Sequence, residues 1–168
     1  LIFTARDYFT RHDNDLYKTA LAYFYSGCVY REQENYEFAM LNYKNAQSYA
    51  ERSADSSLMG LIQFNLGDLL SIQGLHREAL ESYKIAEMIY GGIADKQIRC
   101  LSAIGRMFLL LQLPDSAFIY FHKGLELAQT IRDENRQSLL AQNLSVAYSE
   151  VKQYEEAAIY LRQSFNLN

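Results

Sequence analysis

The histidines and cysteines of this sequence are its candidates for acid–base, nucleophilic or metal chemistry. His12, His76 and His122 have no Ser or Cys partner at a spacing typical of a catalytic triad. Cys28 and Cys100 lie 72 residues apart, with no second Cys and no His at the spacing of metal ligands. We therefore expect two buried free thiols, no metal site and no catalytic residue, because free cysteine is among the most buried residue types.

Arg99 and Arg106 are a charged pair whose spacing fits molecular recognition. Seven residues separate them, about two helical turns, so both lie on one face of a helix with Ser102 between them. Guanidinium groups bind carboxylates through two parallel hydrogen bonds. The pair therefore predicts either a site for an acidic partner or, if Asp68 lies nearby, an internal ion pair.

Glycine-rich loops that hold nucleotide phosphates are absent from the sequence. Neither GxGxxG nor GxxxxGKS/T occurs, and the pair Gly91-Gly92 falls between two expected helices rather than after a strand. The sequence therefore predicts a protein that is not an enzyme and that binds no cofactor.

The composition predicts an all-α fold. Of the 168 residues, 49% are apolar and 21% are charged, which is ample for a core and argues against disorder. A single proline and eight glycines leave too few turn residues for a sheet of many strands.

Charge and hydropathy exclude two classes of partner. With a net charge of -4 and no stripe of Lys and Arg, the chain is not expected to bind nucleic acid. The longest apolar runs, such as residues 107–113, fall far short of the roughly 20 residues of a membrane span. The sequence does not begin with a targeting segment, so the compartment stays open, with the cytoplasm favoured and the periplasm as the alternative.

Four small residues recur along the chain at intervals of 40, 38 and 40 positions, and an alanine follows each of them after twelve. The four pairs are Gly27 with Ala39, Gly67 with Ala79, Gly105 with Ala117, and Ser145 with Ala157. A large residue follows each alanine after four positions: Tyr43, Tyr83, Phe121 and Leu161. Self-similarity at this period predicts a solenoid of about four antiparallel helix hairpins, in which neighbouring repeats complete one another's core.

The repeated glycine has a physical reason, because a glycine inside a helix costs roughly 1 kcal/mol relative to alanine. Helices pack 8 to 10 Å apart, depending on the side chains at their contact. We expect each glycine to face the alanine of its hairpin and so to allow a close approach, with the large aromatic residues beside them. Gly74 is expected to break the chain between the two helices of the second hairpin.

These positions resemble the tetratricopeptide repeat family. The second repeat matches best, and the fourth, with Ser145 and Ser164, matches least. The resemblance implies a right-handed superhelix with repeats at residues 15–54, 55–94, 95–132 and 133–168. These repeats exceed the usual 34 residues by about six, as in peptide-responsive bacterial regulators and the cargo-binding light chains of motors.

The ends of the sequence are interpreted as the ends of a segment of a longer protein. Residues 1–14 resemble the second helix of a preceding repeat, and the last residues resemble a repeat helix without a polar cap. Because open ends of such arrays need covering, we expect the chain either to continue or to self-associate there.

Four aspartates are expected to stand just before the first helix of each repeat and to cap its free N–H groups. They are Asp15, Asp55, Asp95 and Asp133. Pro114 is expected at the first position of a helix, where its missing N–H has no cost.

In the family, the first helix of each repeat lines a concave groove. Carried over, the resemblance implies ten binding residues: Phe24, Tyr25, Phe64, Asn65, Asp68, Arg99, Ser102, Arg106, Gln142 and Asn143. Further groove positions include Leu21, Cys28, Arg31, Leu61, Ser71, Ala103, Leu139, Val146 and Ser149. The alternatives are packing against adjacent helices for the three aromatic residues and a solvated helix position for Asn65.

The function expected from this pattern is a non-catalytic scaffold that binds a peptide or protein segment in the groove. The segment would come from another protein or from another domain of the same protein. The alternative is a sensory array that responds to a peptide or small ligand and controls a kinase or a transcriptional output.

Overall fold

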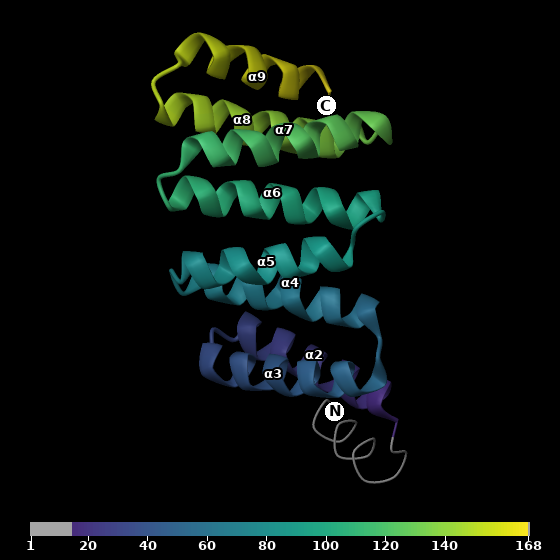
Figure 1. Cartoon of the computed structure of the whole chain (residues 1–168). Coiled ribbons are helices and arrows are strands. Elements are labelled where there is room, and N and C mark those ends of the chain that lie inside the picture. Colours follow the sequence, from purple (N-terminus) through teal and green to yellow (C-terminus); the bar gives the residue numbers. More distant parts are fainter. Residues whose placement is uncertain (1–14, 168) are drawn as a thin grey trace. The chain divides into compact units, whose positions relative to one another are not determined.

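The computed structural model describes residues 15–167, in which eight helices form four hairpins (Figure 1). The chain divides after Ile89 into two compact units. The first contains α2 (Leu16–Glu32), α3 (Tyr36–Ser53), α4 (Ser56–Ile72) and α5 (His76–Ile89). The second contains α6 (Ala94–Leu110), α7 (Pro114–Thr130), α8 (Glu134–Glu150) and α9 (Tyr154–Asn166). The predicted all-α class with about four hairpins is confirmed, while the prediction for residues 1–14 lies outside the described residues.

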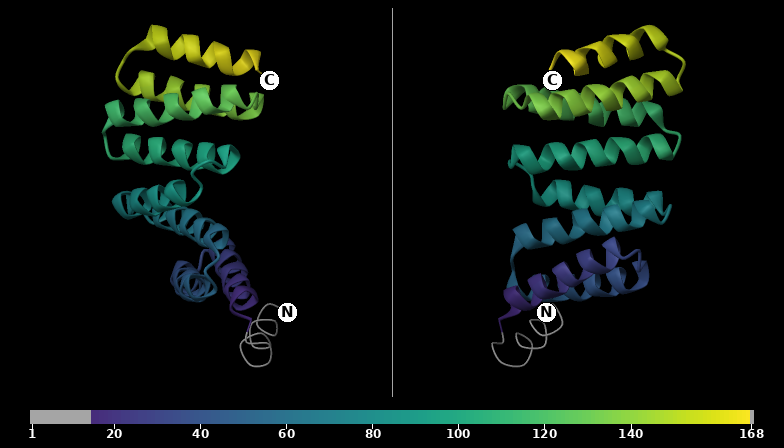
Figure 2. Two further views of the ribbon diagram at one scale, coloured as in Figure 1. Left: turned by 45° about the vertical axis from the view of Figure 1, so that its right-hand side comes forward. Right: turned by 180° about the vertical axis from the view of Figure 1, so that it is seen from behind.

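Within each unit, the helices pack as successive hairpins (Figure 2). In the first unit α2 packs on α3 and α4 packs on α5, while α3 and α4 join the two hairpins. In the second unit α6 packs on α7 and α8 packs on α9, while α7 contacts α8. The first helices of neighbouring hairpins also touch, α2 against α4 and α6 against α8. Each unit therefore has one face built from first helices.

Each hairpin turns at one residue with a left-handed backbone. Gly74 has φ +77° between α4 and α5, as its position in the sequence predicts. The other three hairpins use Glu34, Gln112 and Lys152, with φ between 57° and 63°. Although the left-handed region is disfavoured for residues with a Cβ, local backbone hydrogen bonds close these turns, as from the N–H of Asn35 to the carbonyl oxygen of Tyr30.

The repeated glycines accommodate an aromatic ring of the second helix. A Cβ added at Gly67 would lie 2.7 Å from Cε1 of Tyr83, and one added at Gly27 would lie 2.6 Å from Cδ1 of Tyr43. The added Cβ at Gly27 would also lie 3.3 Å from the backbone oxygen of Ala39, so this glycine faces the alanine as well as the ring. Both rings are at most 1% exposed and form the centre of their hairpins.

The fourth hairpin departs from this arrangement in both partners. Ser145 takes the place of the glycine, and Leu161, in the place of the aromatic residue, is 44% exposed. The hydroxyl group of Ser145 donates a hydrogen bond to the carbonyl oxygen of Ala157 at 2.8 Å, and that of Ser138 donates to the carbonyl of Ser164 at 2.9 Å. These bonds tie α8 to α9, so the serines hold this hairpin together where the other three use a buried ring.

Three of the four predicted caps are confirmed. Asp15, Asp55 and Asp133 precede α2, α4 and α8, and each carboxylate accepts a hydrogen bond from the backbone N–H three residues later. The prediction for Asp95 is wrong, because α6 already begins at Ala94 after Ile93. Pro114 begins α7, as predicted.

Asp95 has a different partner. Arg136 in the first turn of α8 donates a hydrogen bond from Nη2 to Oδ1 of Asp95 and from Nε to Oδ2 of Asp133, the latter at 2.9 Å. The guanidinium group thus connects the beginnings of α6 and α8. Asp95 lies two residues after the cap position Ile93, too late to cap α6, but its carboxylate binds the Arg136 side chain of α8.

Replacing Asp55 by alanine should cost about 1 kcal/mol of unfolding free energy, the typical value for a lost helix cap. Oδ1 of Asp55 accepts a hydrogen bond from the N–H of Leu58 at 2.7 Å. Asp55→Asn keeps a side-chain acceptor and should stay close to the wild type in urea unfolding. Equal destabilisation by both substitutions would show that the charge, rather than the cap, stabilises α4.

Candidate functional site

The ten predicted binding residues belong to the first helices but differ in exposure. Three are buried, namely Phe24, Phe64 and Ser102. Asn65, Asp68 and Asn143 are half-buried. Tyr25, Arg99, Arg106 and Gln142 are exposed. Only four of the ten predicted binding residues are therefore fully exposed.

The two phenylalanines pack against the aromatic residues of their own hairpins. The ring of Phe24 lies 5.9 Å from that of Tyr43, and the ring of Phe64 lies 5.3 Å from that of Tyr83. Both phenylalanines are at most 9% exposed. Tyr25, at 55% exposed, lies with its ring 5.4 Å from Phe24. Of these three aromatic residues, only Tyr25 is exposed.

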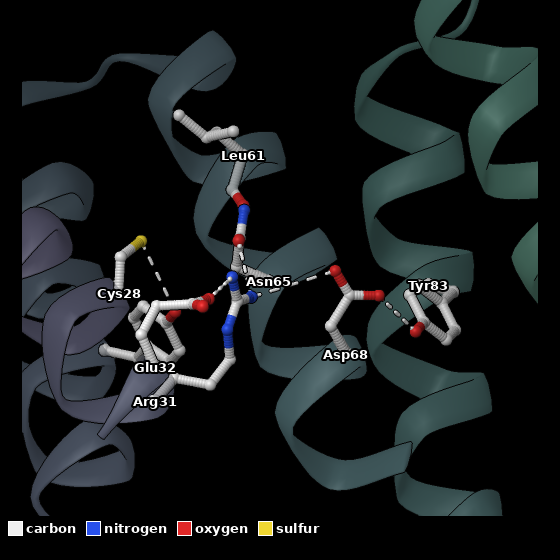
Figure 3. Close-up of polar contacts among 8 residues, drawn as sticks. Cys28, Arg31, Glu32, Leu61, Asn65, Asp68 and Tyr83 are labelled. Atoms are coloured by element: carbon white, nitrogen blue, oxygen red, sulfur yellow. Dashed lines mark hydrogen bonds and ion pairs between the residues drawn. The ribbon is translucent and has the colours of Figure 1, made fainter. Parts of the chain in front are cut away.

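Arg31, in the last turn of α2, is the centre of a polar network on the first unit (Figure 3). Nη1 of Arg31 donates a hydrogen bond to Oδ1 of Asn65 at 3.1 Å, and Nη2 donates to Oε1 of Glu32 at 3.1 Å. The other end of the Asn65 amide donates to the carbonyl oxygen of Leu61 at 2.9 Å. Both ends of the Asn65 amide are therefore engaged within the unit.

Asp68 also has its partners in this network. Its Oδ1 accepts a hydrogen bond from the hydroxyl group of Tyr83 at 2.6 Å, and its Oδ2 lies 4.0 Å from Nη1 of Arg31 (Figure 3). The sequence pattern places Arg31 in the groove but does not indicate that Arg31 holds both Asn65 and Asp68. One sequence signal could have predicted this network. It is a basic residue in the last turn of α2 combined with an amide and a carboxylate on one face of α4.

The two cysteines differ in burial. Cys100 is buried, as predicted, whereas Cys28 is only partly buried. The hydroxyl group of Tyr43 donates a hydrogen bond to Sγ of Cys28 at 3.5 Å. Burial, reinforced by this bond, raises the pKa of Tyr43. Tyr43 therefore remains a neutral donor that fixes the position of the thiol.

Two hydrogen-bonded residues join the first helices of the second unit. Nδ2 of Asn143 on α8 donates a hydrogen bond to Oγ of Ser102 on α6 at 3.0 Å. Ser102 is 7% exposed. Ser102 and Asn143 therefore connect α6 to α8, and the exposed surface of these two helices is formed by other residues.

The surface of the second unit exposes two arginines on α6 and two aliphatic residues on α8. Arg99 and Arg106 are exposed, and Leu139 and Val146 are 49% and 53% exposed. With Gln142, which is also exposed, these residues define what we call the α6/α8 face. No hydrogen bond or ion pair links Arg106 to another described residue of this unit.

Tyr90 adds a neutral group near the beginning of α6. Burial raises its pKa to about 12, while the positive charge of Arg99 acts in the opposite direction. Nζ of Lys96 lies 4.6 Å from the centre of the ring. Since the phenol stays protonated at neutral pH, Tyr90 does not supply a negative charge to Arg99.

Within residues 15–167, no group of three or more His, Cys, Asp or Glu side chains is placed to hold a metal ion. None of the helices in that part of the chain is both long and apolar enough to cross a membrane.

The model of the tetratricopeptide repeat family matches residues 140–168. The matched residues fall in the fourth repeat, so the expectation that this repeat resembles the family least is wrong. No curated protein matches the chain significantly. The family resemblance inferred from the repeated residues is supported by this match and by similar structures of repeat proteins.

Three solved structures illustrate the likeness. A protein of Podosopora anserina, described as a kinesin light chain with nearly identical TPR-like repeats, is 13% identical over 99% of this chain and 83% of its own, with a TM-score of 0.83. A signal-transduction ATPase of Pyrococcus horikoshii with a tetratricopeptide repeat sensor is 21% identical over 91% and 24%, with a TM-score of 0.86. The Rap conjugation regulator of plasmid pLS20, in complex with the Phr* peptide, is 17% identical over 94% and 44%, with a TM-score of 0.78. The chain thus spans less than half of the last two proteins.

Proposed function

We propose that this chain, which has the fold of tetratricopeptide repeat proteins, is a non-catalytic scaffold that binds a segment of another protein on its α6/α8 face. The fold is one generally used for protein interaction, and the observation that carries the proposal is the composition of this face. Arg99 and Arg106 are exposed on α6, and Leu139 and Val146 are exposed on α8, which contacts α6. Arginine is enriched at protein interfaces, and exposed aliphatic groups beside it supply the apolar contact.

The first unit is a weaker candidate for the same role. Asn65 and Asp68, its predicted polar binding groups, are bonded to Arg31 and Tyr83. A partner would have to break these contacts before it could use either side chain, and unpaired groups left behind are costly. We therefore assign binding to the second unit and a supporting role to Arg31.

A sensory array is the second candidate function. It is favoured by the two similar structures whose descriptions name a repeat sensor and a bound signalling peptide. In that case the ligand would be a peptide, and binding would control an output domain of a longer protein. A purified chain that binds a short peptide or small ligand, but no folded protein, would favour this candidate.

Reversing both arginines of the α6/α8 face should weaken partner binding at least about tenfold, a loss of about 1.4 kcal/mol. The partner is first recovered with a photo-crosslinking residue at position 142 and then titrated against Arg99→Glu/Arg106→Glu. Since exposed charge changes usually alter stability by less than about 0.5 kcal/mol, the melting temperature should hardly change.

The matched control is Arg77→Glu/Arg162→Glu, which reverses two exposed arginines on the second helices α5 and α9. It carries the same change of net charge and should bind like the wild type at both low and high salt. Equal weakening by both double variants would attribute the effect to net charge alone. Intact binding by the α6/α8 variant would remove these arginines from the site.

A further inference from the structure

We propose that the segment bound on the α6/α8 face is an amphipathic helix with acidic residues seven positions apart. This inference rests on the proposed function and adds the chemistry and conformation of the partner. It follows from the register of α6 and α8, from the spacing of the exposed side chains, and from the shortage of groups that could hold an extended backbone.

The register of the two helices is set by polar contacts that span equivalent sequence distances. Ser102 bonds to Asn143, and Asp95 bonds to Arg136, both 41 residues apart. Arg99 and Leu139 are 40 residues apart, as are Arg106 and Val146. By this register each arginine lies within one residue, or about 1.5 Å along the helix axis, of the level of one aliphatic residue on the neighbouring helix.

These two arginine–aliphatic levels lie seven residues apart along both helices, or about 10.5 Å. A partner helix with a seven-residue repeat presents its side chains at the same spacing, and helices with matched repeats pack along their length. Such a helix would place a carboxylate against each arginine and an apolar side chain against Leu139 and Val146. The acidic side chains of such a helix would thus meet the arginines of α6, and its apolar side chains would meet the aliphatic residues of α8.

An extended segment fits this face less well. Its backbone N–H and C=O groups would need partners on the α6/α8 face, because unpaired polar groups are costly to bury. The amide nitrogen of Asn143 already donates to Ser102. The equivalent position on α6 is Ala103, which leaves Gln142 as the amide side chain of the face that is exposed. A helix satisfies its own backbone and needs only the side-chain contacts that the face offers.

The charge of the partner follows from the neighbouring acidic groups. Asp95 and Asp133 are both engaged by Arg136 at the beginning of the two helices. Arg106 has no acidic partner among the described residues of its unit. A carboxylate of the bound helix would therefore meet a guanidinium group without displacing an existing ion pair of Arg106.

Three synthetic peptides of about 21 residues test the proposal by fluorescence anisotropy with the whole chain. The first carries Glu every seven residues beside a leucine stripe, the second has the same composition in scrambled order, and the third has a proline at the centre of the first. The first should bind at least about tenfold more tightly than the others and should gain helicity on binding. The scrambled peptide lacks the seven-residue spacing, and the central proline of the third peptide breaks its helix.

A charge swap provides the specific control. The variant Arg99→Glu/Arg106→Glu should no longer bind the first peptide and should instead bind a version with Lys in place of each Glu. The control Arg77→Glu/Arg162→Glu should still bind the first peptide and should not bind the Lys version. Equal affinity for the regular, scrambled and proline-containing peptides would overturn the helical partner.

The recovered natural partner separates this inference from the proposed function. A cross-link from position 142 to a segment that remains extended when bound would retain the binding face and reject the helix. If the natural partner is recovered only with a cross-linking residue on another helix, and its affinity is the same for Arg99→Glu/Arg106→Glu and the wild type, the proposed function itself fails.

Discussion

The substitution Ala79→Arg is expected to unfold the hairpin of α4 and α5. Ala79 lies in the first turns of α5 and is completely buried. An arginine there would place an uncompensated charge and a long side chain in the core, at a cost of about 3 to 5 kcal/mol. This is a large part of the total stability of a typical domain, about 5 to 15 kcal/mol. Urea unfolding followed by circular dichroism measures the loss.

Met88→Arg is the matched control, because it introduces the same side chain into the same helix at a position that is 73% exposed. It should change the free energy of unfolding by less than about 0.5 kcal/mol. Hydrogen exchange should place the damage of Ala79→Arg in α4 and α5, since repeats depend mainly on their neighbours. A stable Ala79→Arg variant would contradict the close packing of this hairpin.

The substitution Gly105→Ala is expected to destabilise the second unit by about 1 to 3 kcal/mol, the usual cost of overpacking a core. The sign of the change in unfolding free energy is informative, because replacing a glycine within a helix by alanine otherwise stabilises by up to about 1 kcal/mol. The added methyl group would collide with three ring carbons of Phe121, which is completely buried. Thermal and urea unfolding measure the effect.

The double variant Gly105→Ala/Phe121→Leu tests the cause. A leucine leaves room for the methyl group, as the natural pair Ser145 and Leu161 does in the fourth hairpin. The double variant should therefore be more stable than the sum of the two single changes predicts. Gly124→Ala serves as comparison, because its methyl group would meet the side chain of Leu140 at 3.2 Å and so requires a smaller shift. Additive effects would exclude a direct contact between residues 105 and 121.

The sequence by itself determined that the chain forms about four helix hairpins and where three of their first helices begin. The physical reason is that a repeat array buries residues at fixed positions, so the period of small, alanine and large residues records the packing directly. Caps are equally local, because an aspartate three residues before a free N–H can bond to it. Asp95 was misleading about its helix, since α6 begins at Ala94, two residues earlier than a cap at Asp95 would place it.

Only the tertiary structure decided which side chains face solvent and which partners they have. Phe24 and Phe64 occupy binding positions in the sequence pattern, but Tyr43 and Tyr83 cover their rings. Arg31 engages an amide 34 residues away, and Asn143 bonds to a serine 41 residues away. Such pairs depend on the register and distance between neighbouring helices, which no single repeat encodes. The sequence therefore indicates which positions lie on the first helices, while contacts between repeats leave Arg99, Arg106, Leu139 and Val146 exposed.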